Sequence, residues 1–164
     1  MNFLDWLSPR HLVWVIIGLI GFIVTFLSFL PFVFKESTLP FSLMHREHEA
    51  TAYIDGTPFR VHLLTTEFQR IKGLSGKETL DPNEGMYFVF DRDGQWGIWM
   101  KDMNFPIDIF WIAEDGTIVD MRTYVHPDTY PQVFTNETPA RYVLEVLSGT
   151  AEAYNIQIGS KVTF

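Results

Sequence analysis

Hydrophobic and polar positions divide the chain into two parts with different patterns. Residues 12–34 form a run of 23 residues without a charge, and about 20 apolar helical residues are enough to cross a bilayer. We therefore predict one transmembrane helix at 12–34, which attaches the chain to the membrane, and a short N-terminal tail at 1–11. The run lacks the small-residue cleavage site of a secretory signal, which favours an uncleaved signal anchor.

The charges beside this segment give little guidance on its orientation. Arg10 precedes it, and Lys35 and Arg46 follow it, whereas Lys and Arg normally concentrate on the cytoplasmic side. A single N-terminal span before one folded domain commonly acts as a signal anchor, and long domains translocate largely regardless of charge. We therefore expect a juxtamembrane linker at 35–49 and a domain outside the cytoplasm at 50–164.

From residue 50 onward, the pattern changes to short apolar or alternating segments separated by turn residues, which is typical of β-strands. Asp55-Gly56 is a strong hairpin signal. In the segment 59–64 apolar and polar residues alternate, so His62 is expected to face solvent. The segment 126–139 contains three prolines and is predicted to be a long surface loop. The predicted strands are 50–55, 59–64, 85–90, 97–102, 107–113, 117–125 and 141–147, followed by a hairpin at 156–164, with turns at 91–95 and 114–117.

Two short segments have helical character. The sequence TEFQRIKGL starts with a threonine N-cap and has Glu67 in its first turn. Phe68, Ile71 and Leu74 fall on one side of this helix, and a second short helix is predicted at 149–155. Together with seven to eight short strands, one or two such helices predict a mostly β (α+β) domain, folded as a compact antiparallel barrel or sandwich.

Composition excludes several functional classes. From Glu47 onward the chain has nine Lys/Arg and eighteen Asp/Glu, a net charge of −9. A domain with this charge should repel nucleic acid, so no nucleic-acid partner is expected. The chain has no cysteine, which excludes disulfides, a thiol nucleophile and cysteine metal sites. No other metal or cofactor motif is present, so we predict no metal site and no cofactor.

The stretch WMKDMNFPIDIFWI, residues 99–112, places charges inside an aromatic run. If its two apolar halves form a hairpin with a two-residue or four-residue loop, Lys101 lies opposite Asp108 and Trp99 lies opposite Phe110. Asp102 then points to the other face, because side chains alternate along a strand. We therefore predict a structural Lys101–Asp108 ion pair, of the kind that stabilises a sheet by roughly 0.2–1 kcal/mol.

Three further residues are candidates for a binding surface. Trp96 lies next to Gly97 and a predicted turn, so it is the tryptophan expected to be most exposed. Arg70 on the first helix is placed to reach Asp108 or Glu145. Aromatic faces with a few polar groups form pockets for sugars or peptides. The predicted binding residues are Trp96, Trp99, Lys101, Asp102, Asp108, Arg70 and Glu145, and no catalytic residue is assigned.

The chain resembles the uncharacterised DUF192 (UPF0127) family in five ordered blocks: TTEFQRIKGL, DPNEGMYFVF, IWMKDMNFPIDIFWIAEDGTIV, YVLEVLSG and IGSKVTF. The resemblance covers about residues 57–164. It departs from the family pattern at Ser75, where the family usually has Met, and at Asp102-Met103, where it usually has Asn-Thr. The resemblance implies a small, mostly β fold that is often exported or membrane-tethered, and it supplies neither a reaction nor catalytic residues.

Two functional classes remain open. The first is a membrane-anchored binding or assembly module outside the cytoplasm, whose ligand is a cell-envelope glycan, an extended peptide or a membrane-protein partner. The second is a hydrolase-like enzyme that uses carboxylates such as Asp102 and Glu145, since burial in the apolar segment 141–147 would raise the pKa of Glu145. Carboxyl groups that converge in an open cleft would favour the enzyme, and carboxyl groups engaged in ion pairs would favour the module.

Overall fold

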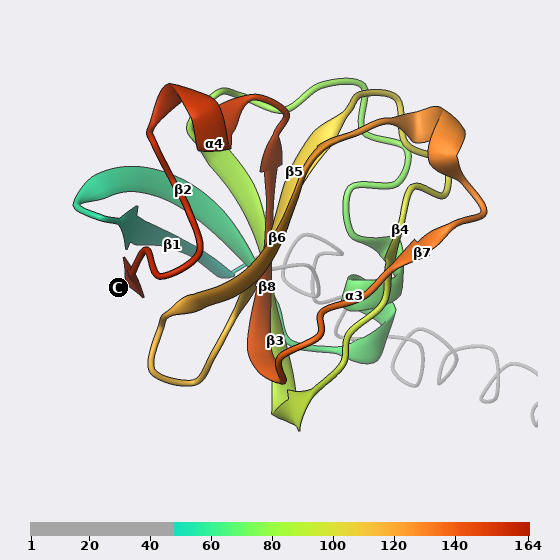
Figure 1. The fold of residues 1–164 in the computed structure, drawn as a ribbon. Coiled ribbons are helices and arrows are strands. Elements are labelled where there is room, and N and C mark those ends of the chain that lie inside the picture. The colour runs from blue at the N-terminus through green and yellow to red at the C-terminus, as the bar shows by residue number, and fades with distance from the viewer. Residues whose placement is uncertain (1–47) are drawn as a thin grey trace, which may run out of the picture. The chain divides into compact units, whose positions relative to one another are not determined.

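The computed structural model describes residues 48–164 (Figure 1). The predicted tail, the predicted transmembrane helix at 12–34 and most of the predicted linker lie outside these residues. In the described part of the chain, none of the helices has the length and hydropathy needed to cross a bilayer. The first strand begins at His48, slightly before the predicted start of the domain.

The described residues are mostly β, as predicted, with nine strands, two short α-helices and one 3-10 helix. The Asp55-Gly56 hairpin forms, and Ile54 pairs with Thr57 across it. The elements in chain order are β1 (His48–Ile54), β2 (Thr57–Leu64), α3 (Glu67–Lys72), β3 (Glu84–Gly94), β4 (Ile98–Trp99), β5 (Ile107–Ile112), β6 (Ile118–Val125), η2 (Pro127–Thr129), β7 (Val133–Phe134), β8 (Ala140–Leu147), α4 (Thr150–Ala153) and β9 (Val162–Thr163).

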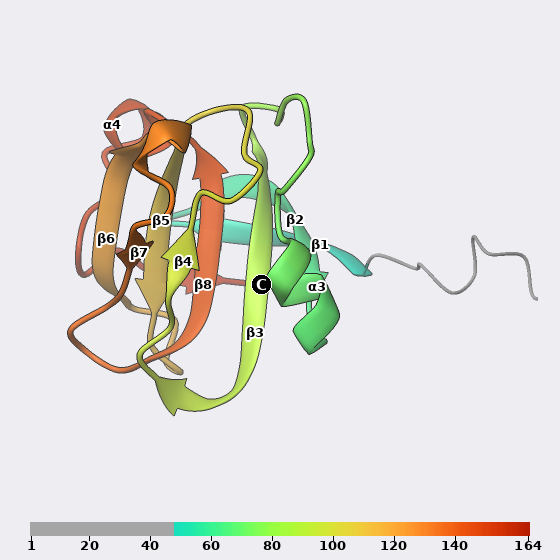
Figure 2. The same ribbon diagram turned by 90° about the vertical axis from the view of Figure 1, so that its right-hand side faces the viewer.

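Seven strands form one curled sheet in the order β6-β5-β8-β3-β2-β1-β9. All neighbouring strands are antiparallel except β2 and β3, which are parallel and are connected through α3. β1 and β2 cross the direction of β3, β8 and β5, which gives the sheet its half-barrel shape (Figures 1 and 2). β4 and β7 form a separate two-stranded sheet.

A hydrophobic cluster lies on each face of the curled sheet. One cluster contains Met86, Met100 and Trp111 and packs beneath α3, β4 and β7; the other contains Phe59 and Phe110 and packs beneath α4 and β9. β5 is buried along its whole length, because it lies between β6 and β8 and is covered on both faces. Each fully buried large apolar side chain contributes about 1.5–3 kcal/mol relative to exposure.

The predicted hairpin between 97–102 and 107–113 is wrong. β4 pairs with β7, with Ile98 opposite Phe134 and Trp99 opposite Val133, whereas β5 pairs with β6 and β8. Asp102 has a positive φ of 55°, so the chain turns away directly after β4. The hairpin prediction assumed the shortest connection, and the actual partner of β4 lies more than thirty residues further along the chain.

Two smaller predictions are also wrong, and a third is incomplete. The segment 91–94 continues β3 instead of forming a turn. The C-terminal segment does not form its own hairpin, since β9 pairs with β1. The predicted loop 126–139 contains η2 and β7 and supplies the partner strand of β4. In each case a distant segment offers hydrogen bonds that a local pattern cannot reveal.

His62 is buried, contrary to the prediction. Its Nε2 lies 2.8 Å from Oε1 of Glu84, and this carboxylate also accepts hydrogen bonds from Lys77 and Arg60. The parallel pairing of β2 with β3 brings these residues together. His62 therefore meets a buried carboxylate rather than solvent, whereas Arg60, which binds the same carboxylate, stays exposed.

Candidate functional site

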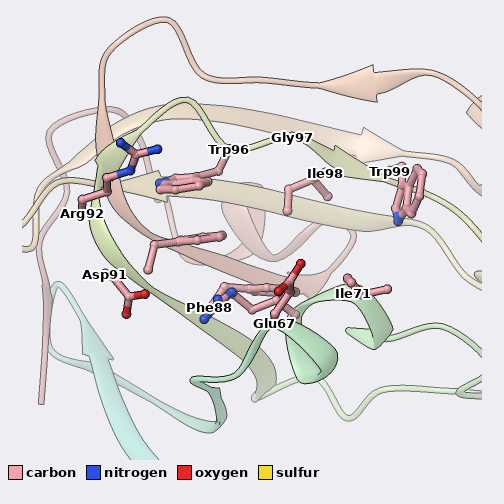
Figure 3. A pocket seen from close by; sticks show the side chains of 11 residues that line it. Glu67, Ile71, Phe88, Asp91, Arg92, Trp96, Gly97, Ile98 and Trp99 are labelled. Atoms are coloured by element: carbon pink, nitrogen blue, oxygen red, sulfur yellow. The ribbon is translucent and has the colours of Figure 1, made fainter.

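An open cleft with four aromatic residues in its lining lies between α3 and the segment 96–99 that leads into β4. Its volume is about 620 Å³, within the range of about 300–1,000 Å³ that is typical of ligand pockets. Figure 3 shows Trp96, Gly97, Ile98 and Trp99 along one side of the cleft, with Ile71 and Glu67 of α3 on the other. The residues that line it are Glu67, Arg70, Ile71, Phe88, Phe90, Asp91, Arg92, Trp96, Gly97, Ile98 and Trp99.

The tryptophan wall of the cleft is held in place by buried hydrogen bonds. Asn136, which is only 1% exposed, accepts a hydrogen bond from the Trp96 backbone N–H at 2.8 Å and donates to the Gly94 and Thr138 carbonyls. The Trp96 indole N–H donates to the Ala140 carbonyl at 2.7 Å. The wall is therefore fixed before any ligand arrives, which reduces the entropy cost of binding.

Trp96 is half-buried and is not the most exposed tryptophan, contrary to the prediction. Its ring stacks on Phe90 at a centroid distance of 3.9 Å and an interplanar angle of 5°. Trp99 is the exposed tryptophan, with 43% of its surface accessible. The Asn136 bonds draw Trp96 inward, whereas Trp99 on the two-residue strand β4 faces solvent at the mouth of the cleft.

Arg70 closes one end of the cleft but reaches neither Asp108 nor Glu145. Its Nη1 donates to the Thr65 and Val89 carbonyls, both at 2.8 Å, and its guanidinium lies 5.2 Å from the centroid of the Phe90 ring. Val89 lies on β3, so the guanidinium is engaged by a backbone carbonyl of the sheet and not by a carboxylate. Arg70 thus holds α3 against β3.

The apolar side of α3 faces solvent beside the cleft. The predicted threonine N-cap is confirmed at Thr66, which forms a capping box with Gln69. Of the three apolar residues predicted to share one side, only Leu74 is buried, whereas Phe68 is 70% and Ile71 60% exposed. Large exposed apolar side chains next to a cleft indicate a surface that binds a partner.

A smaller cavity of about 40 Å³ adjoins the cleft and is lined by Glu145. Six residues, including Ile71, Phe88 and Trp99, line both spaces. Glu145 lies on β8 between Met86 of β3 and Ile109 of β5 and is 5% exposed. Burial raises the pKa of its carboxyl to about 8, because desolvation disfavours the charged form.

The predicted Lys101–Asp108 ion pair does not form. Asp108 is completely buried and accepts hydrogen bonds from the backbone N–H groups of Tyr124 and Ala151, each at 2.9 Å. The Lys101 Nζ lies 5.9 Å from the centroid of the Trp99 ring, as a cation–π contact at the surface. Because the hairpin does not form, Lys101 and Asp108 do not lie opposite each other. Asp108 instead joins β5 to β6 and to α4.

The candidate carboxylates do not converge. Asp108 and Glu145 lie on opposite faces of the sheet, because Glu145 pairs with Ile109, the neighbour of Asp108 in the alternating strand. Asp102 is exposed and does not line the cavity that contains Glu145. Among residues 48–164, no group of three His, Cys, Asp or Glu side chains has the arrangement of a metal site.

Sequence comparison places the domain in a family. Residues 50–164 match DUF192, described as Uncharacterized ACR, COG1430. The chain belongs to the DUF192 family. The resemblance seen in the five sequence blocks is thereby confirmed for the domain, and no curated protein matches the chain.

Two solved structures share the fold of this DUF192 domain. One is described as a candidate transcription regulator from Sinorhizobium meliloti 1021, with a TM-score of 0.68 and 26% identity over 71% of this chain and 94% of that chain. The other is a protein of unknown function from Novosphingobium aromaticivorans DSM 12444, with a TM-score of 0.67 and 26% identity over 71% of this chain and 85% of that chain.

Sequence reasoning missed several residues that build the cleft of the DUF192 domain. Phe88 and Phe90 lie two residues apart on β3. The sequence predicted only that they belong to a buried strand, although both line the cleft. Nothing in the sequence pattern marked Asn136 as a residue that builds the cleft, apart from its place in a proline-containing segment. Its role depends on the pairing of β4 with β7, which local periodicity does not encode.

Proposed function

We propose that this DUF192 domain is a binding module for an extended peptide, which lies in the aromatic cleft between α3 and β4. The apolar segment 12–34 tethers the module to the membrane, with the domain outside the cytoplasm. The peptide is part of a membrane protein or a cell-envelope protein.

The observation that carries this proposal is the cleft itself. Its volume of about 620 Å³ is lined by four aromatic side chains, and the backbone and indole of Trp96 are fixed by three hydrogen bonds. Rigid aromatic side chains bind at a low cost in conformational entropy. The exposed Phe68 and Ile71 extend the apolar surface along α3.

An unpaired strand edge supports a peptide as the ligand. β4 belongs to a sheet of only two strands, so its edge opposite β7 has no strand partner. This edge lies on the side of α3 and β3 (Figure 2), and residues 97–99 line the cleft. Extended peptides commonly bind by adding a strand to such an edge, with alternate side chains in pockets.

A glycan fits this cleft less well than a peptide does. One face of the Trp96 ring is already covered by Phe90, and the guanidinium of Arg70 is engaged by two backbone carbonyls. The polar side chains that remain in the lining, those of Glu67, Asp91 and Arg92, are all charged. The apolar residues of α3 are better suited to peptide side chains.

We do not extend the description of the Sinorhizobium meliloti relative as a transcription regulator to this chain. From Glu47 onward nine basic and eighteen acidic residues give a net charge of −9. DNA binding depends on basic side chains that neutralise phosphates. The charge of this domain favours a partner that is not a nucleic acid.

A hydrolase-like enzyme is the second candidate, and Glu145 is the observation that favours it. Burial raises the pKa of this carboxyl to about 8, which suits a general acid at neutral pH. Asp102 does not line the same cavity, so the mechanism would depend on Glu145. Turnover of an amide or glycoside substrate that is lost in Glu145→Gln would support the enzyme over the module.

The binding proposal is tested with an array of random peptides, each about eight residues long, probed with the full-length chain in detergent micelles. Peptides selected by the wild type should bind Trp99→Ala about tenfold more weakly, because the variant loses a central aromatic contact. Tyr53→Ala is the matched control, since Tyr53 is 42% exposed on β1 and lines none of the cavities described above.

Methylation of backbone nitrogens separates strand addition from side-chain binding alone. A selected peptide should lose affinity when alternate backbone N–H groups are methylated, because those groups donate to β4. No selection above background, or equal binding by Trp99→Ala and wild type, would contradict the proposed function.

The proposed location is tested by protease treatment of intact cells. The domain should be degraded from outside once any outer barrier is permeabilised, while a cytoplasmic marker protein stays intact. A domain that is cleaved only after lysis of the cytoplasmic membrane would contradict the proposed orientation.

A further inference from the structure

The Glu145 carboxyl is a buried acid without a partner in the described domain. Among residues 48–164, its side chain takes part in no hydrogen bond or ion pair, although it is only 5% exposed. Its cross-strand neighbours, Met86 and Ile109, are apolar. Buried carboxyl groups are normally hydrogen-bonded or paired, so this position calls for a donor from outside the domain.

The cavity beside Glu145 has the size of one small polar group. Its volume of about 40 Å³ exceeds the roughly 30 Å³ that a water molecule occupies in the liquid. Ser75 also lines the cavity, and its hydroxyl donates to the Lys101 carbonyl at 2.8 Å. The Ser75 oxygen can therefore still accept a hydrogen bond from a group in the cavity that Glu145 also lines.

The only charged groups that line the cavity besides Glu145 come from α3. Arg70 donates to two backbone carbonyls instead, and the exposed Lys72 makes no ion pair with Glu145. β3 and β4 contribute Phe88, Ile98 and Trp99, which are uncharged. Among residues 48–164, no direct ion pair thus balances the charge of an ionised Glu145, although Arg70 and Lys72 line the same cavity.

The cavity and the open cleft share a mainly apolar set of lining residues. Ile71, Phe88, Ile98 and Trp99 line both spaces. Their side chains suit a stem of methylene groups that ends in a hydrogen-bond donor.

We propose that Glu145 and Ser75 form a subsite for an alkylammonium group, namely the end of a lysine side chain of the bound peptide. The proposal rests on the proposed function, because the peptide in the cleft supplies the lysine. An ammonium group matches both the cavity volume and the two acceptor residues, whereas the planar guanidinium of arginine is larger. The net charge of −9 from Glu47 onward attracts a cationic ligand at long range.

Binding of the ammonium group is linked to release of a proton. The pKa of Glu145 is about 8 in the free domain, so at neutral pH most of the carboxyl groups are protonated. A cation binds the ionised form and lowers this pKa. The affinity should therefore rise about tenfold for each pH unit up to about pH 8 and then level off.

The test uses n-butylammonium as the probe and n-butanol as its neutral counterpart, with the full-length chain in detergent micelles. Carbon NMR of labelled glutamate carboxyl groups gives the pKa of Glu145 in the wild type, with and without each probe. We expect n-butylammonium to lower the pKa and n-butanol to leave it unchanged. Equal effects of the two probes on the pKa would overturn the subsite.

Two test variants and one control variant complete the test. Glu145→Gln should weaken n-butylammonium binding about 10-fold to 100-fold, the loss expected for a charged hydrogen bond, while Glu114→Gln, an exposed carboxylate elsewhere, should have no effect. Lys72→Met should leave the Glu145 pKa unchanged; a rise would identify Lys72 as the resident cation and overturn the proposal. If these results are not obtained but the peptide still binds in a Trp99-dependent way, the subsite alone is overturned. If no peptide binds, the proposed function is overturned.

Discussion

Asp108 uses both carboxylate oxygens to accept backbone N–H groups. It is completely buried, and its partners, Tyr124 and Ala151, belong to β6 and α4. Tyr124 has a positive φ of 55°, so its backbone conformation depends on this contact. One side chain thus joins three elements.

Replacing Asp108 should strongly destabilise the domain. Asp108→Ala leaves two backbone donors without partners and should lower the free energy of unfolding by about 2–5 kcal/mol. Asp108→Asn should also destabilise, because its NH₂ group cannot accept a hydrogen bond. Chemical denaturation measures the effect, with the exposed Glu78→Ala as control; unchanged stability in Asp108→Ala would contradict this role.

The ionisation of Glu84 makes the stability of the fold depend on pH. Burial opposes its ionisation, but hydrogen bonds from Lys77 and His62 outweigh burial and lower the pKa of Glu84 from 4.5 to about 2. A lowered pKa stabilises the fold above the pKa of the unfolded state and loses this effect as pH falls through the folded value. The Glu84 contribution should therefore be complete above about pH 5 and disappear between about pH 4.5 and pH 2.

This dependence is measured by comparing wild type with Glu84→Gln. The wild type should have the larger free energy of unfolding at neutral pH, and the difference should shrink as the pH falls toward 2. A difference that stays constant over this range would show that the ionised Glu84 does not stabilise the fold.

At the residue scale, the sequence predicted which residue types matter better than it predicted their contacts. Trp99 and Glu145 were chosen from composition and do line the cleft and its adjoining cavity. Lys101 and Asp108 were paired by assuming a hairpin, and Arg70 was assigned a distant carboxylate. These contacts depend on strand pairing, which a single sequence determines only weakly.

At the scale of elements, features that depend on local signals were predicted, whereas long-range strand pairings were not. The N-cap of α3 and the β1–β2 hairpin were predicted because their hydrogen bonds join neighbours in sequence. The parallel β2–β3 pair and the β4–β7 pair were not predicted, since each joins segments separated by a helix or by several strands. The cleft depends on the second group of contacts.

Asn136 provides the test at this scale, because it joins the segment before β4 to the segment after β7. Asn136→Ala removes two donated hydrogen bonds and one accepted bond, and should lower the free energy of unfolding by about 1–3 kcal/mol. Amide exchange at Trp96 should become faster than in the exposed-residue control Gln95→Ala. Unchanged exchange at Trp96 would contradict the proposed fixing of the cleft wall.

At the scale of the whole molecule, the described domain contains its own core. Residues 48–164 form two hydrophobic clusters, and β9 near the C-terminus pairs with β1. The sheet therefore joins the two ends of the domain. The mostly β fold predicted for residues 50–164 is confirmed, whereas the division of the chain into an apolar segment and one domain remains a prediction.

A fragment of residues 48–164 should fold without the apolar segment. We expect one cooperative unfolding transition, because residues 48–164 form two hydrophobic clusters. Calorimetry and tryptophan fluorescence should give the same midpoint. A fragment that lacks cooperative unfolding would show that the N-terminal segment contributes to the fold.

The central claim is that an extended peptide adds to the free edge of β4 inside the aromatic cleft. The most direct measurement is amide hydrogen exchange of the full-length chain with and without a saturating selected peptide. We predict slower exchange at residues 97–99, which line the cleft, and little change along β6 at the edge of the main sheet. Protection along β6 with no change at 97–99 would contradict the account.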